Sequence, residues 1–551
     1  MTEDYVYAPG TVHLVDVDNV LDVKKQEGKN LNVILNPQPS SNPNDPLRWS
    51  QRKKYFQFGL LWFWGFMLAV LANFGGPAYE PWIEDLHTDY NQLNIAGALL
   101  FLFLGLGCLF LQPTAMKVGR RFVYLLCTVI VMLAMVVGGV GKNVLYIQGS
   151  YIMIGFAAAP VDSLVEISST DVFFQHERST AFALMILALY AGSNLGPVAA
   201  GFVVQAMSWQ WLFWIQLFIY AGLIIIQFFF MFDTTFNRDH DEEDRLEAEI
   251  ISIVKSHESM ALTHGKETRQ KSPEYIDEVV SGCSDLIDQT IEKRTYKDSL
   301  KLIETEYSDP RSWFVIFFRP FLLVSFPAVV WSGLTYGAQI MWLQLMAVTQ
   351  SLVFSAEPYN FSPNGVGLTN LAPFVGCCIG MLYGGNYVDW LSVRLARKNN
   401  GIFEPEMRLH AMWLPLLTNA GGLLAYGLGC NAGVHWAIPV VLGYGCLGFA
   451  MSSSGAICLT YAVDSYHKVG SEALVIILLF RNLIGMAFCF AIDPWLQGCG
   501  LVLTTWLMFM LSLVINGSYI IMLLWGKKFR IWTADLYQKI SEPRFGEFWK
   551  K

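Results

Sequence analysis

Twelve long apolar runs dominate the chain and limit what it can fold into. Each run has about 20 mostly apolar residues, the length that a helix needs to cross about 30 Å of hydrocarbon. Six runs precede residue 233, six follow residue 318, and one polar stretch separates the two sets. We expect the spans near 55–74, 94–115, 122–141, 144–170, 179–206 and 210–232, and then near 319–346, 364–388, 409–429, 435–463, 471–493 and 500–526.

The composition supports a membrane environment. Only 15% of the residues are charged, whereas soluble domains carry about 25%. Strands are not expected, because a membrane barrel would show alternating segments of roughly ten residues. The sequence therefore predicts an all-α membrane protein with 12 transmembrane helices in two six-helix, pseudo-symmetric halves.

Positive charge predicts the orientation of the spans, because Lys and Arg collect in cytoplasmic loops. With the N-terminus inside, the predicted outer loops hold only Lys142, and the inner loops and tail hold Lys117, Arg120, Arg121, Arg178, Arg394, Arg397, Lys398, Arg408, Lys468, Lys527, Lys528 and Arg530. Both termini are therefore expected in the cytoplasm. The expected organisation is an N-terminal segment (1–54), a first half (55–232), a central cytoplasmic loop (233–318), a second half (319–526) and a C-terminal tail (527–551).

Loop and helix motifs resemble those of the major facilitator superfamily. The segment 112–121 is similar to the pattern G-x-L-A-D-R-x-G-R-R, with Met116 at the acidic position, and the loop after the eighth span keeps Asp389. The fifth span resembles the antiporter motif, whose small residues let helices approach and whose proline bends the helix. The residues that carry these two resemblances are Lys117, Gly119, Arg120 and Arg121 in the loop, and Gly192, Gly196, Pro197 and Gly201 in the fifth span.

Further segments resemble the fungal drug:proton-antiporter-like group of that superfamily, which includes histidinol and polyamine permeases. They are 44–50, 159–166, 171–178, 404–409 and 481–482. The resemblance implies the superfamily fold and a proton-coupled carrier in the plasma membrane. Tyr151 stands where the group often has an arginine for proton coupling, so coupling through that position is not expected.

Ionisable residues inside predicted spans are the main functional signal, because burying a charge in lipid costs a few kcal/mol. Asp162 and Glu166 lie near the middle of the fourth span, and a spacing of four residues puts them on one helix face. Two carboxylates suit an amine cation or a proton, although Glu166 has the alternative of pairing with Arg178. Arg481, in the eleventh span, either holds a carboxylate in a structural ion pair or contacts substrate.

Polar and aromatic residues in other spans complete a predicted cavity. Aromatic rings bind ammonium groups by cation–π attraction. The candidates on the fifth, seventh and eighth spans are Tyr190, Asn194, Tyr336, Gln339, Trp342, Gln344 and Asn370.

The sequence thus predicts a secondary active transporter that moves small organic cations, such as polyamines or related amines, or drugs, by alternating access. One alternative is a proton-antiporting exporter of neutral lipophilic compounds, and another is a nutrient sensor with a carrier fold. An enzyme is not expected, since no Walker motif, metal cluster or nucleophile elbow is present. No cofactor, metal or nucleic acid is expected, and the partners are a small-molecule substrate, protons and the lipid bilayer around a monomer.

Overall fold

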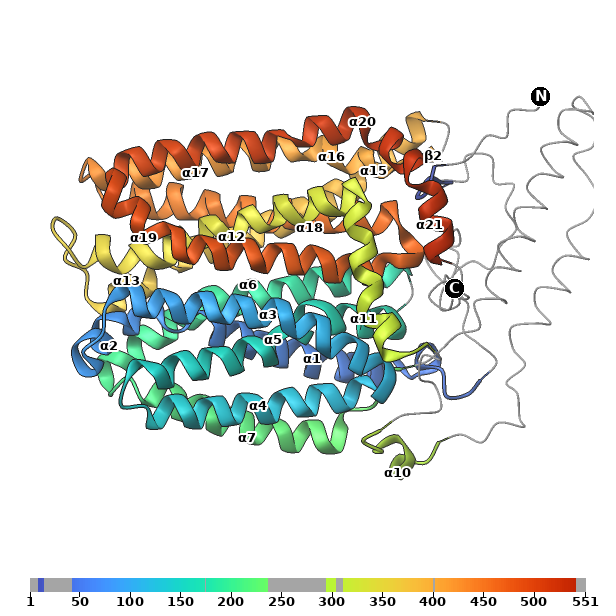
Figure 1. The fold of residues 1–551 in the computed structure, drawn as a ribbon, viewed down its shortest axis with the longest axis horizontal. Coiled ribbons are helices and arrows are strands. Elements are labelled where there is room, and N and C mark those ends of the chain that lie inside the picture. Colours follow the sequence, from blue (N-terminus) through green and yellow to red (C-terminus); the bar gives the residue numbers. More distant parts are fainter. Residues whose placement is uncertain are drawn as a thin grey trace, which may run out of the picture.

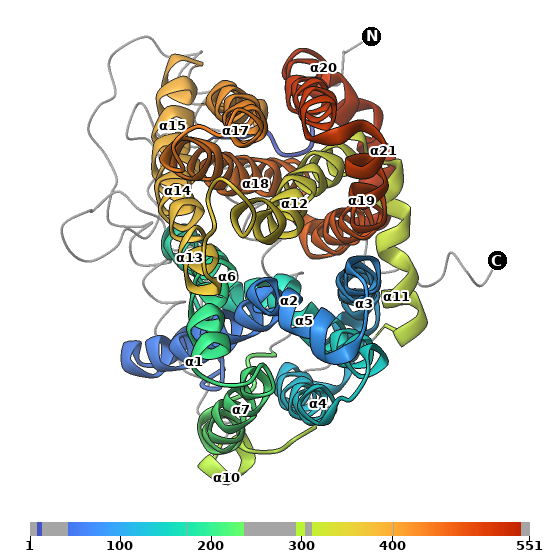
Figure 2. The same cartoon turned by 90° about the vertical axis from the view of Figure 1, so that its left-hand side faces the viewer.

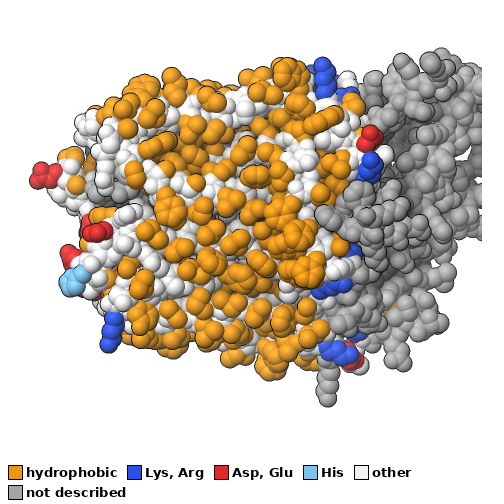
Figure 3. All heavy atoms as spheres, viewed as in Figure 1, with side chains coloured by type: hydrophobic (Ala, Val, Ile, Leu, Met, Phe, Trp, Pro, Cys, Tyr) orange, Lys and Arg blue, Asp and Glu red, His pale blue; other side chains and the backbone are white. Residues whose placement is uncertain are grey.

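Long helices run side by side through the whole molecule (Figure 1). The computed structural model describes residues 8–13, 42–173, 175–235, 294–303, 311–399 and 402–541. Hydrophobic side chains cover the visible flank, while charged side chains gather at its two ends (Figure 3). This distribution is what a lipid belt requires, and it confirms the prediction of an all-α membrane protein.

The first half contains six long helices that match the six predicted spans. Viewed from one end, these helices lie together on one side of the molecule and the second half lies on the other (Figure 2). A short helix, α2 (Tyr79–Leu86), follows the first span. The six spans are α1 (Gln51–Asn73), α3 (Tyr90–Val118), α4 (Arg120–Val140), α5 (Val144–Val172), α6 (Gln175–Ala206) and α7 (Trp211–Phe230).

The second half uses more irregular helices. Two spans contain π-helical turns, at Tyr383–Tyr387 and Ile438–Tyr444. The longest helix turns at Gly500, whose φ of +69° is easy only for glycine, and so supplies two spans. The helices are α12 (Pro327–Phe354), α13 (Pro363–Leu368), α14 (Leu371–Leu382), α15 (Val388–Lys398), α16 (Glu406–Leu409), α17 (Trp413–Asn431), α18 (Gly445–Ser465), α19 (Gly470–Gly517), α20 (Tyr519–Trp532) and α21 (Ala534–Ser541).

The described helices account for twelve spans. Ten of them are long and apolar enough to cross a membrane. The eleventh is α12, which passes the same test together with the preceding segment Trp313–Ser325, from which it is bent by 91°. The twelfth is α17, which has 19 residues and packs between α18 and α19.

The prediction that the seventh span begins at 319 was wrong. The span begins at Pro327, because Phe326 takes an extended conformation (φ −96°, ψ 109°) before it, and a residue that precedes proline is driven out of the α region. Residues Trp313–Leu322 form a separate helix, α11.

Helix α11 links the two halves at the end of the bundle where α3 ends and α19 begins, which we call the basic end. Trp313 Nε1 donates a hydrogen bond to Thr114 Oγ1 of α3 at 3.3 Å. Arg319 forms an ion pair with Glu472 of α19 at 3.1 Å and donates to the carbonyl of Ile540 at 2.7 Å. The sequence predicted this stretch as part of the central loop and the seventh span, and its pattern did not indicate a separate linking helix.

Residues 8–13 of the N-terminal segment lie on the second half, although the first half follows them in the chain. Strand β1 (Val12–His13) pairs antiparallel with β2 (Ile402–Phe403). Gly10 has a φ of +81°, and a Cβ there would lie 2.4 Å from the Asp464 carbonyl oxygen. Beside it Arg530 donates to the Pro9 carbonyl and forms an ion pair with Glu406. The segment is therefore docked by backbone pairing and by a close approach that only glycine permits.

This docking predicts a specific cross-link. With Val12→Cys and Phe403→Cys in a background without other cysteines, mild oxidation should form a disulfide, because cross-strand Cα atoms lie about 4.5–5.5 Å apart. After cleavage at a protease site inserted in the central loop, the two halves should stay covalently joined until the disulfide is reduced. Adding Gly10→Val should greatly reduce the yield. Equal yields with and without Gly10→Val would contradict the docking.

Candidate functional site

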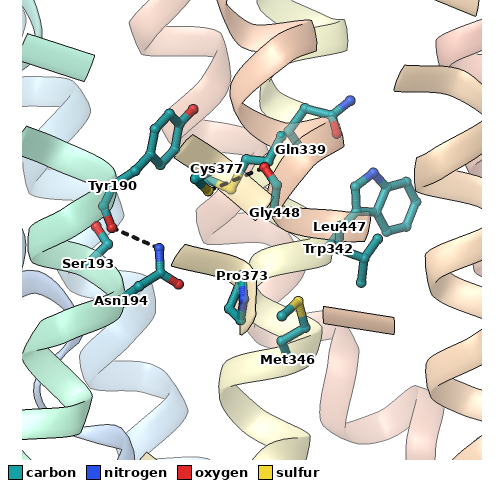
Figure 4. Close-up of a pocket in the computed structure, with 11 residues that line it drawn as sticks. Tyr190, Ser193, Asn194, Gln339, Trp342, Met346, Pro373, Cys377, Leu447 and Gly448 are labelled. Atoms are coloured by element: carbon teal, nitrogen blue, oxygen red, sulfur yellow. Dashed lines mark hydrogen bonds between the residues drawn. The ribbon is translucent and has the colours of Figure 1, made fainter. Parts of the chain in front are cut away.

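A cavity lies between the two halves, about midway along the bundle. The first half contributes Tyr190, Ser193 and Asn194 of α6, which face residues of three helices of the second half across the cavity (Figure 4). Those residues are Gln339, Trp342 and Met346 of α12, Pro373 and Cys377 of α14, and Leu447, Gly448 and Met451 of α18. A space shared by both halves is where a rocking carrier would bind its substrate.

Small residues bring the helices of the cavity wall together. A Cβ on Gly448 would lie 2.3 Å from the carbonyl oxygen of Pro373, and one on Gly376 would lie 2.0 Å from the carbonyl oxygen of Gly445. The thiol of Cys377 donates to the Gly448 carbonyl at 3.2 Å (Figure 4). Helices α14 and α18 therefore pack at backbone distance, as small residues allow in membranes.

Four of the predicted site residues line the cavity, Trp342 among them, whereas Tyr336, Arg481 and Asn370 do not. Tyr190, Asn194 and Gln339 are the other three that line it, and the Asn194 amide donates to the Tyr190 carbonyl at 2.8 Å. Asn370 lies instead at the junction of α13 and α14, where its amide donates to the Gly367 carbonyl at 3.2 Å. Their roles in binding stay predictions.

Gln339 belongs to a hydrogen-bonded network inside the second half. Its Nε2 donates to Asn516 Oδ1 at 2.9 Å, and its Oε1 accepts from Asn419 Nδ2 at 2.8 Å. Ser512 donates to Asn419 Oδ1 at 2.7 Å. All four side chains are buried. The network therefore connects α12, α17 and the part of α19 that follows Gly500, and it fixes the orientation of Gln339.

Arg481 lies in α19 with its side chain only 6% exposed. Its Nη1 is 3.3 Å from the Tyr336 hydroxyl, its guanidinium lies 5.2 Å from the Tyr336 ring centre, and its Nε donates to Asn482 Oδ1 at 3.2 Å. A Cβ on Gly455 would lie 2.7 Å from the Tyr336 ring and 3.4 Å from the Tyr190 hydroxyl. The row Arg481–Tyr336–Tyr190 thus crosses from the second half to the first.

Asp162 and Glu166 lie in α5, and their side chains fall outside the described part of the structure. The backbone register of α5 is clear from its neighbours. A Cβ on Gly107 of α3 would lie 2.6 Å from Ala159 Cβ, and one on Gly105 would lie 3.3 Å from Asn482 Cβ. Gly105 and Gly107 are two residues apart in α3, which is a rise of about 3 Å along the helix. Ala159 and Asn482, which contact these two glycines, therefore lie within about 3 Å of the same depth in the bundle.

Basic residues of the loop motif hold the basic end of the first half. Gly119 has a φ of +109°, which joins α3 directly to α4. Arg120 forms an ion pair with Asp171 at the end of α5 and donates to Thr234 at 3.2 Å. Arg121 donates to the Phe228 carbonyl at 2.6 Å. Lys117 ends α3. Asp171 thus supplies a carboxylate partner for the loop, whereas Met116 supplies none.

The second half has a fuller version of this charge cluster. Arg408 contacts Asp464 through Nε and Asp389 through Nη1, each at 2.6 Å. Burial lowers the pKa of Arg408, but the charges of Asp464 and Asp389 outweigh it and the net shift is upward. By position in each half, Arg408 and Asp464 correspond to Arg120 and Asp171, and Asp389 corresponds to Met116.

The glycines of the fifth-span motif serve helix packing. A Cβ on Gly192 would lie 2.3 Å from the Phe66 carbonyl oxygen of α1, and one on Gly196 would lie 3.1 Å from Val70 Cα. Gly201 is buried farther along α6. The Pro197 carbonyl lies 3.0 Å from the Cβ position of Gly367, so this motif also closes α6 against α13 of the other half.

Among the described residues, no group of three His, Cys, Asp or Glu side chains is placed to hold a metal ion.

The two six-helix halves and the cavity between them define a membrane transporter. The model of the Major Facilitator Superfamily matches residues 61–489, and the chain belongs to this family. An uncharacterised MFS-type transporter of Schizosaccharomyces pombe is 30% identical, over 95% of this chain and 92% of its own. Protein HOL1 of Saccharomyces cerevisiae is 27% identical over 98% of both. The human organic anion transporter MFSD10 has a solved structure that covers 86% of this chain and 99% of its own, at 17% identity and a TM-score of 0.49.

The charge cluster of the second half predicts unequal effects of two substitutions. Asp464 is 18% exposed and Asp389 is 41% exposed, so solvent screens the Asp389 pair more. Asp464→Asn should lower the free energy of unfolding by about 1–3 kcal/mol, and Asp389→Asn by clearly less. The thermal midpoints of the purified variants, followed by tryptophan fluorescence, test this order, and a larger drop for Asp389→Asn would refute it.

Proposed function

We propose that the protein is a proton-coupled carrier of small organic cations, amines such as polyamines among them, that works by alternating access in the plasma membrane with both termini in the cytoplasm. The observation that carries the proposal is Arg481, which is buried in the middle of its span on a helix that contacts α5, the helix of Asp162 and Glu166. Of the Asp, Glu, Lys and Arg side chains that the structure describes, it is the one in the middle of the spans. A charge at that depth needs a counter-charge.

The backbone register supports Asp162 as the partner of Arg481. Counting residues along α3, α5 and α19, Asp162 and Arg481 differ by about 6 Å in depth, at about 1.5 Å per residue, and α5 contacts α19 directly. Two facing side chains of this length span that difference. Glu166 lies one further turn toward the basic end, so it is the additional carboxylate of the site.

This arrangement gives the site a net charge of −1, from two acids and one guanidinium. In a medium of low dielectric, such a site binds one positive charge, either a proton or an ammonium group, but not both. Competition between the two ions couples their movement in opposite directions. The guanidinium already lies over the Tyr336 ring, so the Tyr190 ring, which lines the cavity next to Tyr336, is the π-face left for an organic cation.

A second candidate is the export of neutral lipophilic compounds, with the α5 acids serving protons only. The apolar lining of the cavity, with Trp342, Met346, Leu447 and Met451, favours it. The resemblances differ on the direction of transport, because the permeases favour uptake and the α6 motif favours export. Measuring net flux in each direction distinguishes the two.

Radiolabelled spermidine flux in a strain that lacks its own transporters tests the proposal. Expression should give flux that a protonophore abolishes, and either Asp162→Asn or Glu166→Gln should reduce it at least about tenfold, because each leaves a neutral site. Glu84→Gln, an exposed carboxylate of α2, is the matched control and should be neutral. Resistance to lipophilic drugs without any amine flux would favour the second candidate.

The net charge of the proposed site also predicts a rescue. Asp162→Asn leaves one acid and Arg481, whereas Asp162→Asn combined with Arg481→Gln restores a net charge of −1 through Glu166. The double variant should therefore recover a clear part of the amine flux that the single variant loses. Arg481→Lys, which keeps the charge, should not rescue Asp162→Asn. If the double variant is no better than Asp162→Asn, the net charge does not govern binding.

A further inference from the structure

We propose that the cavity binds the uncharged part of the substrate, and that the indole N–H of Trp342 donates a hydrogen bond to an acceptor there. The preferred substrates are then amines whose apolar body carries an ether, carbonyl or hydroxyl oxygen or a ring nitrogen. This inference rests on the proposed transport of organic cations and specifies which part of the site reads which part of the solute.

The first observation is the state of the Trp342 indole. Its side chain is 2% exposed, and its Nε1 has no hydrogen-bond partner in the part of the chain that the structure describes. A buried Trp N–H normally has a partner, since an unpaired donor keeps its full desolvation cost. Trp342 lines the cavity on the side opposite Tyr190 (Figure 4), so a solute in the cavity can supply the missing acceptor.

The second observation is that several neighbouring polar groups are already engaged. Both amide atoms of Gln339 are hydrogen bonded within the second half. The Cys377 thiol donates to Gly448, and the Asn194 amide donates to Tyr190. These groups shape the wall, whereas the Trp342 donor is available without breaking a bond of the protein.

The third observation is where charge lies relative to the cavity. The described lining contains no Asp, Glu, Lys or Arg, and Met346, Leu447, Met451 and Pro373 make much of its wall. An ammonium group inside it would be desolvated without a counter-ion, which costs far more than a hydrogen bond contributes. The ammonium group therefore belongs at the row Arg481–Tyr336 and α5, and Tyr190 borders both parts.

Met346 and Met451 also suit an apolar body that varies between substrates. Methionine has flexible side-chain torsions and a polarisable sulfur, so it adapts to different shapes. The Trp342 N–H then supplies the directional contact that an apolar wall lacks. The site thus binds the cation of the solute at one end and a hydrogen-bond acceptor of the solute at the other.

An ether scan of the solute tests the proposal. The probes are nonylamine and the analogues in which an ether oxygen replaces one methylene at successive positions, with binding to the purified protein measured by calorimetry. In the wild-type protein at least one position should bind more tightly than its neighbours in the scan, by roughly 3- to 10-fold, the effect of one hydrogen bond. In Trp342→Phe this gain should disappear, while the affinity for nonylamine stays.

Trp331→Phe is the matched control, because Trp331 lies on the same helix but donates to Ser518 at 2.8 Å. It should keep the ether preference. A flat scan in the wild-type protein, or a preference that survives in Trp342→Phe, overturns the inference while amine binding itself still stands. If none of the amines binds, the inference and the cation proposal fall together.

Discussion

Lipid imposes one requirement on this molecule: every charge inside the bundle must meet a counter-charge or a strong hydrogen-bond partner. The described ion pairs gather at the basic end, where Arg319, Arg530 and Arg408 each hold a carboxylate. These pairs fasten helix ends and connecting segments. Arg481 departs from this pattern, because it lies far from either end of its span and against Tyr336. The proposed cargo follows from the need to balance that one charge.

The sequence predicted the spans because hydropathy is a local property that needs no knowledge of neighbouring helices. The sequence did not predict features that depend on three-dimensional geometry. Phe326 and Pro327 break a continuous apolar run into α11 and α12 with a bend of 91°, and the pattern of apolar residues alone did not show the break. The pairing of Val12 with Phe403 joins residues almost 400 positions apart in the chain, and two residues carry no strand signal of their own.

The same limit applies to the candidate site. Polar residues in apolar helices indicated Tyr190, Asn194 and Gln339, and all three line one cavity. The sequence does not reveal that Asn419 and Asn516 occupy the amide of Gln339, or that the indole N–H of Trp342 is left without a protein partner. Those facts depend on how three helices meet. Membership in a family gives the fold, whereas the pairing state of each polar atom decides what the cavity can bind.

The two halves have different tasks in the proposed mechanism. The first half carries the acids on α5, and the second half carries Arg481, the polar network and most of the cavity wall. When the halves rock, the distance between α5 and α19 changes, and so does the neutralisation of the acids by Arg481. A bound proton or ammonium group replaces that neutralisation and makes separation of the charges less costly. Because the counter-ions sit on opposite halves, the energy of the conformational change depends on which cation is bound, which is the physical basis of coupling.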